Sequence, residues 1–316
     1  MGAVVRRARR LTSVVEAIGN TPLVRLRRLG ERAPSVEVYV KLEFANPGGS
    51  VKDRAGFRII SDALTSGHLG PGRALIDATS GNTGVAYAMV GAAMGVSIAL
   101  VMPSNVTRAR KDIAEAFGAQ IIPSDPMEGT DGAIRLAQRL VAKSPDRYYY
   151  ADQYSNPGNP LAHYDGTGVE ILDALGDRIT HFVAGLGTSG TMMGVARRLR
   201  RHATAIHCVA VQPAEALHGL EGMKHMPSSL VPAIYDPTVP DEHLSVATDD
   251  GWDMAERVAV EEGLYVGHSS GANIHAALQV AERLHRERGG GCVVTVACDR
   301  ADRYFGQMRW EKKYVW

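Results

Sequence analysis

The chain of 316 residues has little cysteine and almost no net charge. Its three cysteines, Cys208, Cys292 and Cys298, form an odd set without paired Cys-x-x-Cys spacing, which argues against a disulfide framework and a structural zinc site. The 35 basic and 34 acidic side chains nearly cancel, so there is no general attraction to nucleic acid or to an acidic membrane. We therefore expect a small-molecule partner and a reducing, cytoplasmic location.

The sequence also lacks a convincing targeting or membrane segment. Residues 1–10 are basic like the start of a signal peptide, but Glu16 interrupts the chain before an apolar region of useful length develops. Residues 85–102 are uncharged and long enough for a crude membrane-span filter. Because Gly91 and Gly95 divide this stretch, we predict a short buried helix followed by a buried strand instead.

Short apolar runs alternate with amphipathic segments along the whole chain, which predicts helices packed on largely parallel sheets. Strands are predicted at residues 36–42, 74–77, 97–102, 120–123, 181–184, 207–212, 264–266 and 292–297. Helices are predicted at residues 53–66, 83–94, 107–117, 131–143, 160–174, 191–201, 250–262 and 270–286. The chain length is compatible with two domains or one large α/β unit. Because eight strands are too many for one small domain, we place a domain crossing near the turn-rich residues 153–168. We also expect a long functional loop or lid at residues 213–242.

The first motif that carries chemistry is Asn46-Pro-Gly-Gly-Ser-Val-Lys-Asp-Arg54, a turn between a strand and a helix. It places Lys52 in the first helical turn, where the positive end of the helix dipole disfavours an ammonium ion and favours a neutral amine or imine. That environment suits a lysine that forms a Schiff base. Taken alone, Lys52 is more often explained as an ordinary surface lysine, so the other motifs must decide.

The second motif, Thr79-Ser-Gly-Asn-Thr-Gly84, follows a strand and opens an uncharged helix. Backbone N–H groups at such a helix start bind a carboxylate or a phosphate, and Asn82 adds an amide that can bond a ring oxygen. The competing interpretation is a simple capped turn, since Ser, Thr and Asn are common at that position.

The third motif, Gly185-Leu-Gly-Thr-Ser-Gly-Thr191, matches the glycine pattern of dinucleotide-binding loops. The acid expected after the next strand is missing, because that strand ends in Gln212 and Pro213. The hydroxyl groups of the loop suit a compact phosphate monoester instead. The fourth motif, Gly267-His-Ser-Ser-Gly-Ala272, again joins a strand to a helix, and Ser269 could bond a ring nitrogen or simply cap the helix.

Together, in this order, the four motifs resemble the fold type II family of pyridoxal-5′-phosphate enzymes, and most closely the cysteine synthases. Further supporting strings are Ile18-Gly-Asn-Thr-Pro-Leu23, Lys41-Leu-Glu43, Val101-Met-Pro103 and Gly118-Ala119. The resemblance runs from about residue 15 to about residue 304. It implies two three-layer α/β domains with mainly parallel sheets, as in the tryptophan synthase β chain. A smaller, mobile domain would comprise residues 48–155, a larger one residues 1–47 and 156–316, and the cofactor would lie between them.

The resemblance also implies a role for each motif. Lys52 would form the internal aldimine and then move the Cα proton, Asn82 would bond the 3′-oxygen of the cofactor ring, and Ser269 would lie at the pyridine nitrogen. The phosphate would lie on Gly187, Thr188, Ser189, Gly190 and Thr191. The substrate carboxylate would lie on Thr79, Ser80, Gly81, Asn82 and Thr83, with Gln153 as a further amide donor. No metal is required.

The activity implied is β-replacement on an O-activated L-serine, through an α-aminoacrylate, with a sulfur nucleophile to give L-cysteine. Lys224 lies at about the position where phosphoserine-using relatives place an arginine, so its cation could pair with a phosphate. We therefore expect O-phosphoserine to replace or accompany O-acetylserine. The alternative is that Lys224 is a solvated loop lysine.

Several alternatives to a cysteine synthase stay open. A cystathionine β-synthase-like enzyme and a specialised enzyme making S-sulfocysteine or 2,3-diaminopropionate share the same chemistry, and a non-catalytic homologue is a remote possibility. The resemblance implies a homodimer, with a sulfur-carrier protein or the tail of a serine acetyltransferase as possible partners, and no nucleic acid or membrane.

Three features depart from the family pattern. His268 replaces a branched apolar residue beside Ser269, and we expect it to serve in packing. Cys298 follows the last strand, where the family has a Pro-Asp-Ser/Gly-Gly-like turn, and is either a reactive thiol or a buried small residue. The aromatic tail, residues 310–316, could cover a dimer surface or the active-site mouth, or could fray.

Overall fold

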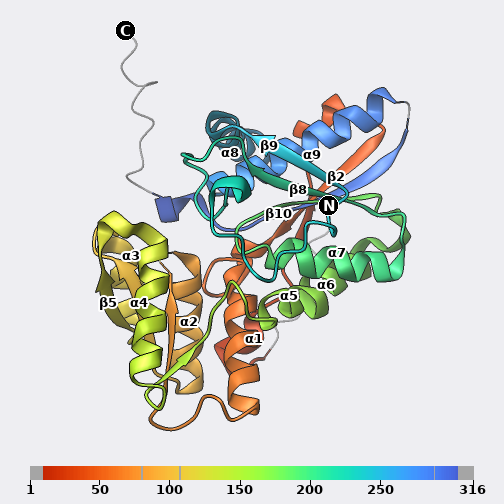
Figure 1. Cartoon of the computed structure of the whole chain (residues 1–316). Coiled ribbons are helices and arrows are strands. Elements are labelled where there is room, and N and C mark those ends of the chain that lie inside the picture. Colours follow the sequence, from red (N-terminus) through yellow and green to blue (C-terminus); the bar gives the residue numbers. More distant parts are fainter. Residues whose placement is uncertain (1–9, 80, 107, 288, 305–316) are drawn as a thin grey trace.

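The computed structural model describes residues 10–304 except 80, 107 and 288, and it contains two β-sheets with helices packed around them (Figure 1). The four-stranded sheet is wholly parallel, in the order β5 (Gln120–Ser124), β4 (Ile98–Pro103), β3 (Ala74–Ala78) and β6 (Tyr148–Tyr150). The six-stranded sheet has the order β1 (Leu23–Arg25), β2 (Val36–Leu42), β10 (Gly291–Ala297), β7 (His181–Gly185), β8 (His207–Pro213) and β9 (Glu242–Val246). Its strands are parallel except for the β1–β2 pair. The predicted α/β fold with mainly parallel sheets is confirmed.

The helices fall between the strands, as the alternating pattern predicted. Four of them lie with the four-stranded sheet in the lower part of Figure 1, namely α1 (Lys52–Thr65), α2 (Asn82–Met94), α3 (Arg108–Ala116) and α4 (Gly129–Lys143). The later ones are α5 (Gly158–Ala162), α6 (Gly168–Leu175), α7 (Gly190–His202), α8 (Thr248–Glu262) and α9 (His268–Arg286). Most observed bounds lie within two residues of the predicted ones.

The uncharged stretch 85–102 forms the predicted helix and strand. α2 ends at Gly95, whose φ of +70° turns the chain out of the helix, and β4 then has all of its residues buried. Within the described residues, no helix is long and apolar enough to cross a membrane.

The predicted strand at 264–266 is wrong. Val266 forms only an isolated bridge to Arg300, because α9 begins at His268 and leaves no room for a longer ladder. Strands β1, β6 and β9 are not among the predicted ones. These strands are short, and β9 has exposed or half-exposed positions through most of its length, so none has the apolar run that identified the central strands.

The predicted helix at 160–174 is interrupted. It consists of α5, a π-helical turn at His163–Thr167 and α6. α7 approaches this segment closely, since a Cβ on Gly194 would lie 2.2 Å from the carbonyl oxygen of Pro160. Such single π turns frequently occur at functional sites. The helix also begins two residues earlier than predicted, at Gly158, within the turn-rich residues 153–168.

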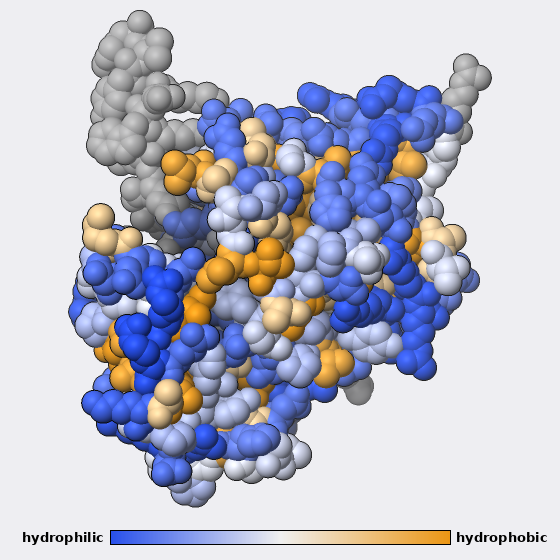
Figure 2. Space-filling model, viewed as in Figure 1, coloured by the Kyte–Doolittle hydropathy of each residue, from blue (hydrophilic) through white to orange (hydrophobic). Residues whose placement is uncertain are grey.

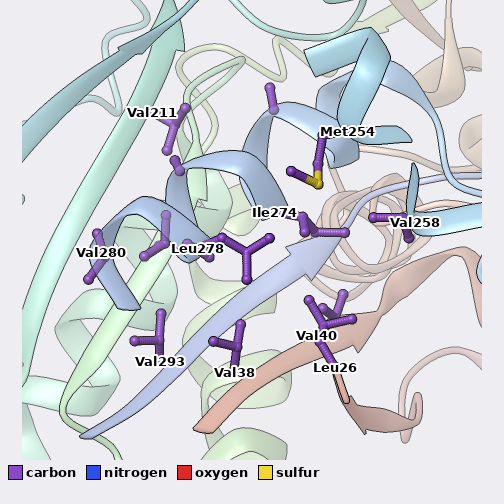
Figure 3. Packing of buried hydrophobic residues seen from close by; sticks show 14 of the residues in the cluster. Leu26, Val38, Val40, Val211, Met254, Val258, Ile274, Leu278, Val280 and Val293 are labelled. Atoms are coloured by element: carbon purple, nitrogen blue, oxygen red, sulfur yellow. The ribbon is translucent and has the colours of Figure 1, made fainter. Parts of the chain in front are cut away.

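The core of the larger sheet is built from branched side chains of its strands against α8 and α9. Figure 3 shows Val38 and Val40 of β2 and Val293 of β10 facing Ile274 and Leu278 of α9. The side of the molecule seen in Figure 2 is mostly hydrophilic, with some hydrophobic residues gathered near its middle. The apolar runs that predicted the strands therefore form the packed interior.

A buried ion network holds the first turn of α1. The Arg54 guanidinium donates to both carboxylate oxygens of Glu43, with distances of 2.6 and 2.8 Å, and to those of Glu170, with distances of 2.7 and 2.8 Å. Lys41 lies 2.6 Å from Glu170, and Thr21 donates to Glu43 across 2.7 Å. The network therefore joins the N-terminal segment, the end of β2, α1 and α6.

The two central side chains of this network are almost fully buried: that of Glu43 is 0% exposed and that of Arg54 is 5% exposed. Burial alone would raise the pKa of Glu43, but the charge and hydrogen bonds of Arg54 outweigh it and hold that pKa below its usual value. Glu43 is thus a buried carboxylate whose charge depends on one guanidinium.

We expect Arg54→Met to destabilise the fold, because Glu43 would remain buried without its counter-charge. The expected loss is about 3–5 kcal/mol in the free energy of unfolding, measured by urea titration. The control is Arg58→Met in the same helix, whose ion pairs with Asp62 and Asp165 are partly exposed and worth about 0–1 kcal/mol. Equal losses in both variants would contradict this role for Arg54.

Candidate active site

Four helix starts carry the predicted site residues. Lys52 begins α1, Asn82 begins α2, Gly190 begins α7, and Ser269 is the second residue of α9. The loops before α2 and α7 leave the carboxyl ends of the parallel strands β3 and β7, which is where open α/β sheets bind ligands. Each helix start contributes partial positive charge and free N–H groups.

Backbone hydrogen bonds hold the loop that leads to Lys52 in place. The N–H of Val51 donates to the carbonyl of Cys298 across 2.8 Å, and the N–H of Lys52 lies 3.2 Å from the Ser50 hydroxyl oxygen. Gly49 has a φ of +79°, which a residue with a side chain rarely adopts. The start of α1 is therefore held beside the segment that follows β10.

The loop before α2 contacts the side chain of Gln153, the residue predicted as a further amide donor to the substrate carboxylate. The Thr83 hydroxyl donates to Oε1 of Gln153 across 2.8 Å, and Nε2 of Gln153 donates to the carbonyl of Ala78 across 3.2 Å. Thr79 is buried, and its hydroxyl accepts from the N–H of Gly81 across 3.4 Å. Ser80 lies outside the described residues.

The loop before α7 has the features of a phosphate site. Ser189 has a φ of +70°, and its buried Oγ has no hydrogen-bond partner among the described residues. Asn159 donates to the Thr188 hydroxyl across 2.9 Å and to the carbonyl of Gln153 across 2.8 Å. It thus links this loop to the segment that contacts Thr83 at the start of α2. A Cβ on Gly187 would lie 2.1 Å from the carbonyl oxygen of Gly222, so only glycine fits there. The orphaned hydroxyl and the helix start fit the phosphate of pyridoxal phosphate.

Sequence reasoning missed two residues that support this loop. One is Asn159. The other is His163, whose Nε2 lies 3.4 Å from the Thr191 hydroxyl and whose Nδ1 lies 2.9 Å from that of Thr167. Burial lowers the pKa of His163 to about 3, so the imidazole stays neutral at physiological pH. In the sequence, His163 cannot be told from an ordinary residue inside a helix. Its contact with Thr191 becomes visible only in the structure, where the π-helical turn packs on α7.

The start of α9 is lined by aromatic rings. Ser269 is buried, and the His268 ring stacks on Trp252 with centroids 3.7 Å apart and planes 9° apart. The Tyr304 ring lies 5.5 Å from that of His268. This geometry is that of a packing histidine, the role we expected for His268.

The cysteines are free thiols, all within the described part of the chain. Burial raises the pKa of Cys298 to about 12, and Asn273 donates to its sulfur across 3.6 Å. A protonated thiol is a poor nucleophile, which favours the buried-residue interpretation of Cys298. Among the residues that the structure describes, no group of three or more His, Cys, Asp or Glu side chains could hold a metal ion. The aromatic tail 310–316 lies outside the described residues.

Lys224 lies in the loop between β8 and β9, close to the loop before α7. Its N–H donates to the carbonyl of Leu186 across 2.7 Å. Its ammonium lies 5.0 Å above the ring of Tyr154, the neighbour of Gln153, and 3.5 Å from the carbonyl oxygen of Leu230. Partial burial lowers the pKa of Lys224. The structure therefore places this cation beside the predicted site.

Known proteins resemble the chain over most of its length. The family model described as pyridoxal-phosphate dependent enzyme matches residues 14–299. A cysteine synthase of Aquifex aeolicus is 48% identical over 92% of this chain and 90% of that protein. The crystal structure of a cysteine synthase from Entamoeba histolytica has a TM-score of 0.92 at 35% identity, covering 97% of this chain and 93% of that one. An O-acetylserine dependent cystathionine β-synthase from Helicobacter pylori has a TM-score of 0.87 at 33% identity, covering 96% and 100%.

We expect Ser189→Ala to weaken the binding of pyridoxal phosphate, because the orphaned hydroxyl would no longer bond the phosphate. A hydrogen bond to a charged group is worth about 1.5–3 kcal/mol, so the Kd should rise on the order of tenfold or more. The Kd is measured by titrating cofactor-free protein and following its tryptophan fluorescence. The control is Ser228→Ala, in the exposed loop between β8 and β9; an equal effect there, or none at Ser189, would refute the assignment.

Proposed function

The chain belongs to the pyridoxal-phosphate dependent enzymes, and we propose that it acts as a cysteine synthase. It replaces the β-substituent of an O-activated L-serine with a sulfur nucleophile and forms L-cysteine. The observation that supports this proposal is that hydrogen bonds link the four helix starts. The segment after β10 contacts the starts of α1, α2 and α9. Asn159 bonds Thr188, before α7, and the carbonyl of Gln153, whose side chain contacts the start of α2. Identity of 48% with a cysteine synthase over most of the chain supports it.

We assign the cofactor contacts to the residues of these loops. Lys52 would bind the cofactor covalently, the start of α7 with Thr188, Ser189 and Thr191 would hold its phosphate, and Ser269 would bond the ring nitrogen. When bound, pyridoxal phosphate supplies an electron sink for the charge that develops at Cα of the substrate. The neutral hydroxyl of Ser269 moderates that sink because it does not force a proton onto the ring nitrogen.

The substrate groups follow from the same geometry. The start of α2 with Thr79, Gly81 and Thr83 would bind the α-carboxylate, since its N–H groups and helix dipole favour an anion. Gln153 would position this loop through the hydroxyl of Thr83. The Lys52 amine would remove the Cα proton and return it after the sulfur has been added.

We further propose that residues 48–155 form the smaller, mobile domain. In support, the strands of the four-stranded sheet lie within this range, and those of the six-stranded sheet lie outside it. A homodimer, a cytoplasmic location, and a sulfur-carrier protein or serine acetyltransferase tail as partner stay predictions from the resemblance.

We expect the holoenzyme to produce L-cysteine from O-acetylserine or O-phosphoserine and sulfide, and Lys52→Ala to lower kcat on the order of 10²–10⁴-fold, the usual contribution of a proton-transfer group. Product is measured by chromatography. Lys143→Ala, at the exposed end of α4, is the control and should retain activity. If wild-type protein formed cystathionine from homocysteine but no cysteine from sulfide, the cystathionine β-synthase alternative would replace this proposal.

The position of the Lys224 ammonium bears on which leaving group the substrate carries. None of the described carboxylates forms an ion pair with Lys224, and its loop is bonded to Leu186, next to the phosphate-binding loop. We therefore propose that it pairs with the phosphate of O-phosphoserine.

Lys224→Met should lower kcat/KM for O-phosphoserine about tenfold or more, the cost of a lost charged hydrogen bond. The kcat/KM for O-acetylserine should change little. The variant Lys224→Arg should retain the wild-type kcat/KM for both donors. Steady-state kinetics with each donor tests this. Unchanged phosphoserine turnover, or equal losses with the two donors, would leave Lys224 as a solvated loop lysine.

A further inference from the structure

The segment 298–304, which follows β10, contacts three of the four helix starts. Towards α1, Cys298 accepts from the N–H of Val51 across 2.8 Å, and Asp299 forms an isolated bridge with Ser50. Towards α9, the N–H of Cys298 donates to the Ser270 hydroxyl across 2.8 Å, and the N–H of Gly267 donates to the carbonyl of Asp299 across 3.0 Å. The third helix start, that of α2, is contacted through side chains.

The side-chain amide of Asn82 is held between an anion and a cation of this segment. Its Nδ2 donates to Oδ2 of Asp299 across 2.6 Å, and its Oδ1 accepts from the guanidinium of Arg303 across 2.5 Å. A carboxylate only accepts hydrogen bonds and a guanidinium only donates them, so one orientation of the amide satisfies both and the flipped one satisfies neither. Two charged groups thus determine which way Asn82 presents its NH₂ group.

The two charged groups are themselves anchored. Asp299 is 1% exposed, and its Oδ2 also accepts from the hydroxyl of Tyr304. Arg303 also donates to the carbonyl of Gly48, in the loop that leads to Lys52. Because Asp299 is buried, its contacts with Asn82 and Tyr304 are made in a largely dry environment, where a misplaced partner is costly. The same burial raises the pKa of Asp299.

The contact also joins the two sheets. Asn82 follows β3 of the four-stranded sheet, whereas Asp299 follows β10 of the six-stranded sheet, 217 residues later in the chain. The amide of Asn82 is therefore fixed relative to the half of the molecule that carries Ser269.

We propose that Asp299 and Arg303 are positioning residues that set the orientation of the Asn82 amide toward the cofactor. This inference rests on the proposed function. The NH₂ group has two hydrogens, of which Asp299 takes one and leaves the second for the 3′-oxygen of pyridoxal phosphate. Loss of either charged group would let the amide turn and weaken that bond, although neither residue itself needs to touch the cofactor.

A double-mutant cycle on cofactor affinity tests the proposal. Asp299→Leu, Arg303→Met and Asn82→Ala are each expected to raise the Kd for pyridoxal phosphate about fivefold to twentyfold, the effect of one lost hydrogen bond. Asp299→Leu made in the Asn82→Ala background should add less than about twofold, because the group that it positions is already gone. Affinity is measured by titration of the cofactor-free protein.

A spectroscopic signature separates positioning from general damage. The absorbance bands of the bound cofactor report the hydrogen bond to its 3′-oxygen, so Asp299→Leu and Asn82→Ala should shift their ratio in the same direction. Asp299→Asn keeps an acceptor oxygen and should restore the wild-type spectrum. Arg300→Met is the matched control, since Arg300 lies in the same segment but is 51% exposed and pairs with Asp302.

The outcomes distinguish the two proposals. Additive losses of affinity in the cycle, or wild-type spectra and affinities in both Asp299→Leu and Arg303→Met, would overturn the positioning role. If Asp299→Leu fails to fold, the Arg303→Met and Asn82→Ala cycle decides the question in the same way. A wild-type protein that takes up no pyridoxal phosphate would overturn the proposed function itself.

Discussion

The geometry of the site depends on the buried charges around Arg54. This guanidinium lies two residues after Lys52 in α1 and binds carboxylates from the end of β2 and from α6. Because Glu43 is fully buried, its charge is tolerated only while Arg54 stays in place. The first turn of α1, and with it the position of the Lys52 backbone, is therefore tied to the turn that follows β2 and to helix α6.

Backbone N–H groups, and not charged side chains, provide most of the groups that could bind anions near the start of α1. The starts of α2 and α7 offer N–H groups and dipoles for two anions, and Asn159 links the two loops by donating to Gln153 and to Thr188. In the proposed function, the anionic cofactor and the substrate carboxylate would thus be bound largely by backbone N–H groups and helix dipoles. The neutral imidazole of His163 contacts the hydroxyl groups of Thr167 and Thr191 without adding charge.

The segment after β10 shows how a departure from a family pattern can have a structural meaning. Cys298 is the residue in this segment that the sequence marks as a possible reactive thiol, yet desolvation raises the pKa of that thiol to about 12, which makes it a poor nucleophile. The neighbouring Asp299 and Arg303 make the contacts that reach Asn82. A sequence motif identifies residue types, whereas their side-chain directions come from the backbone bridges that place this segment between α1 and α9.

The sequence by itself determined the α/β class, the central strands and the helix starts that carry Lys52, Asn82 and Ser269. It could do so because parallel strands are continuous apolar runs and because glycine-bearing loops before helices are local signals. The tertiary structure alone decided the short strands such as β9, the π-helical turn that brings His163 to Thr191, and the contact of Asn82 with Asp299. Those features join residues far apart in the chain, and their energy comes from packing that no local pattern encodes.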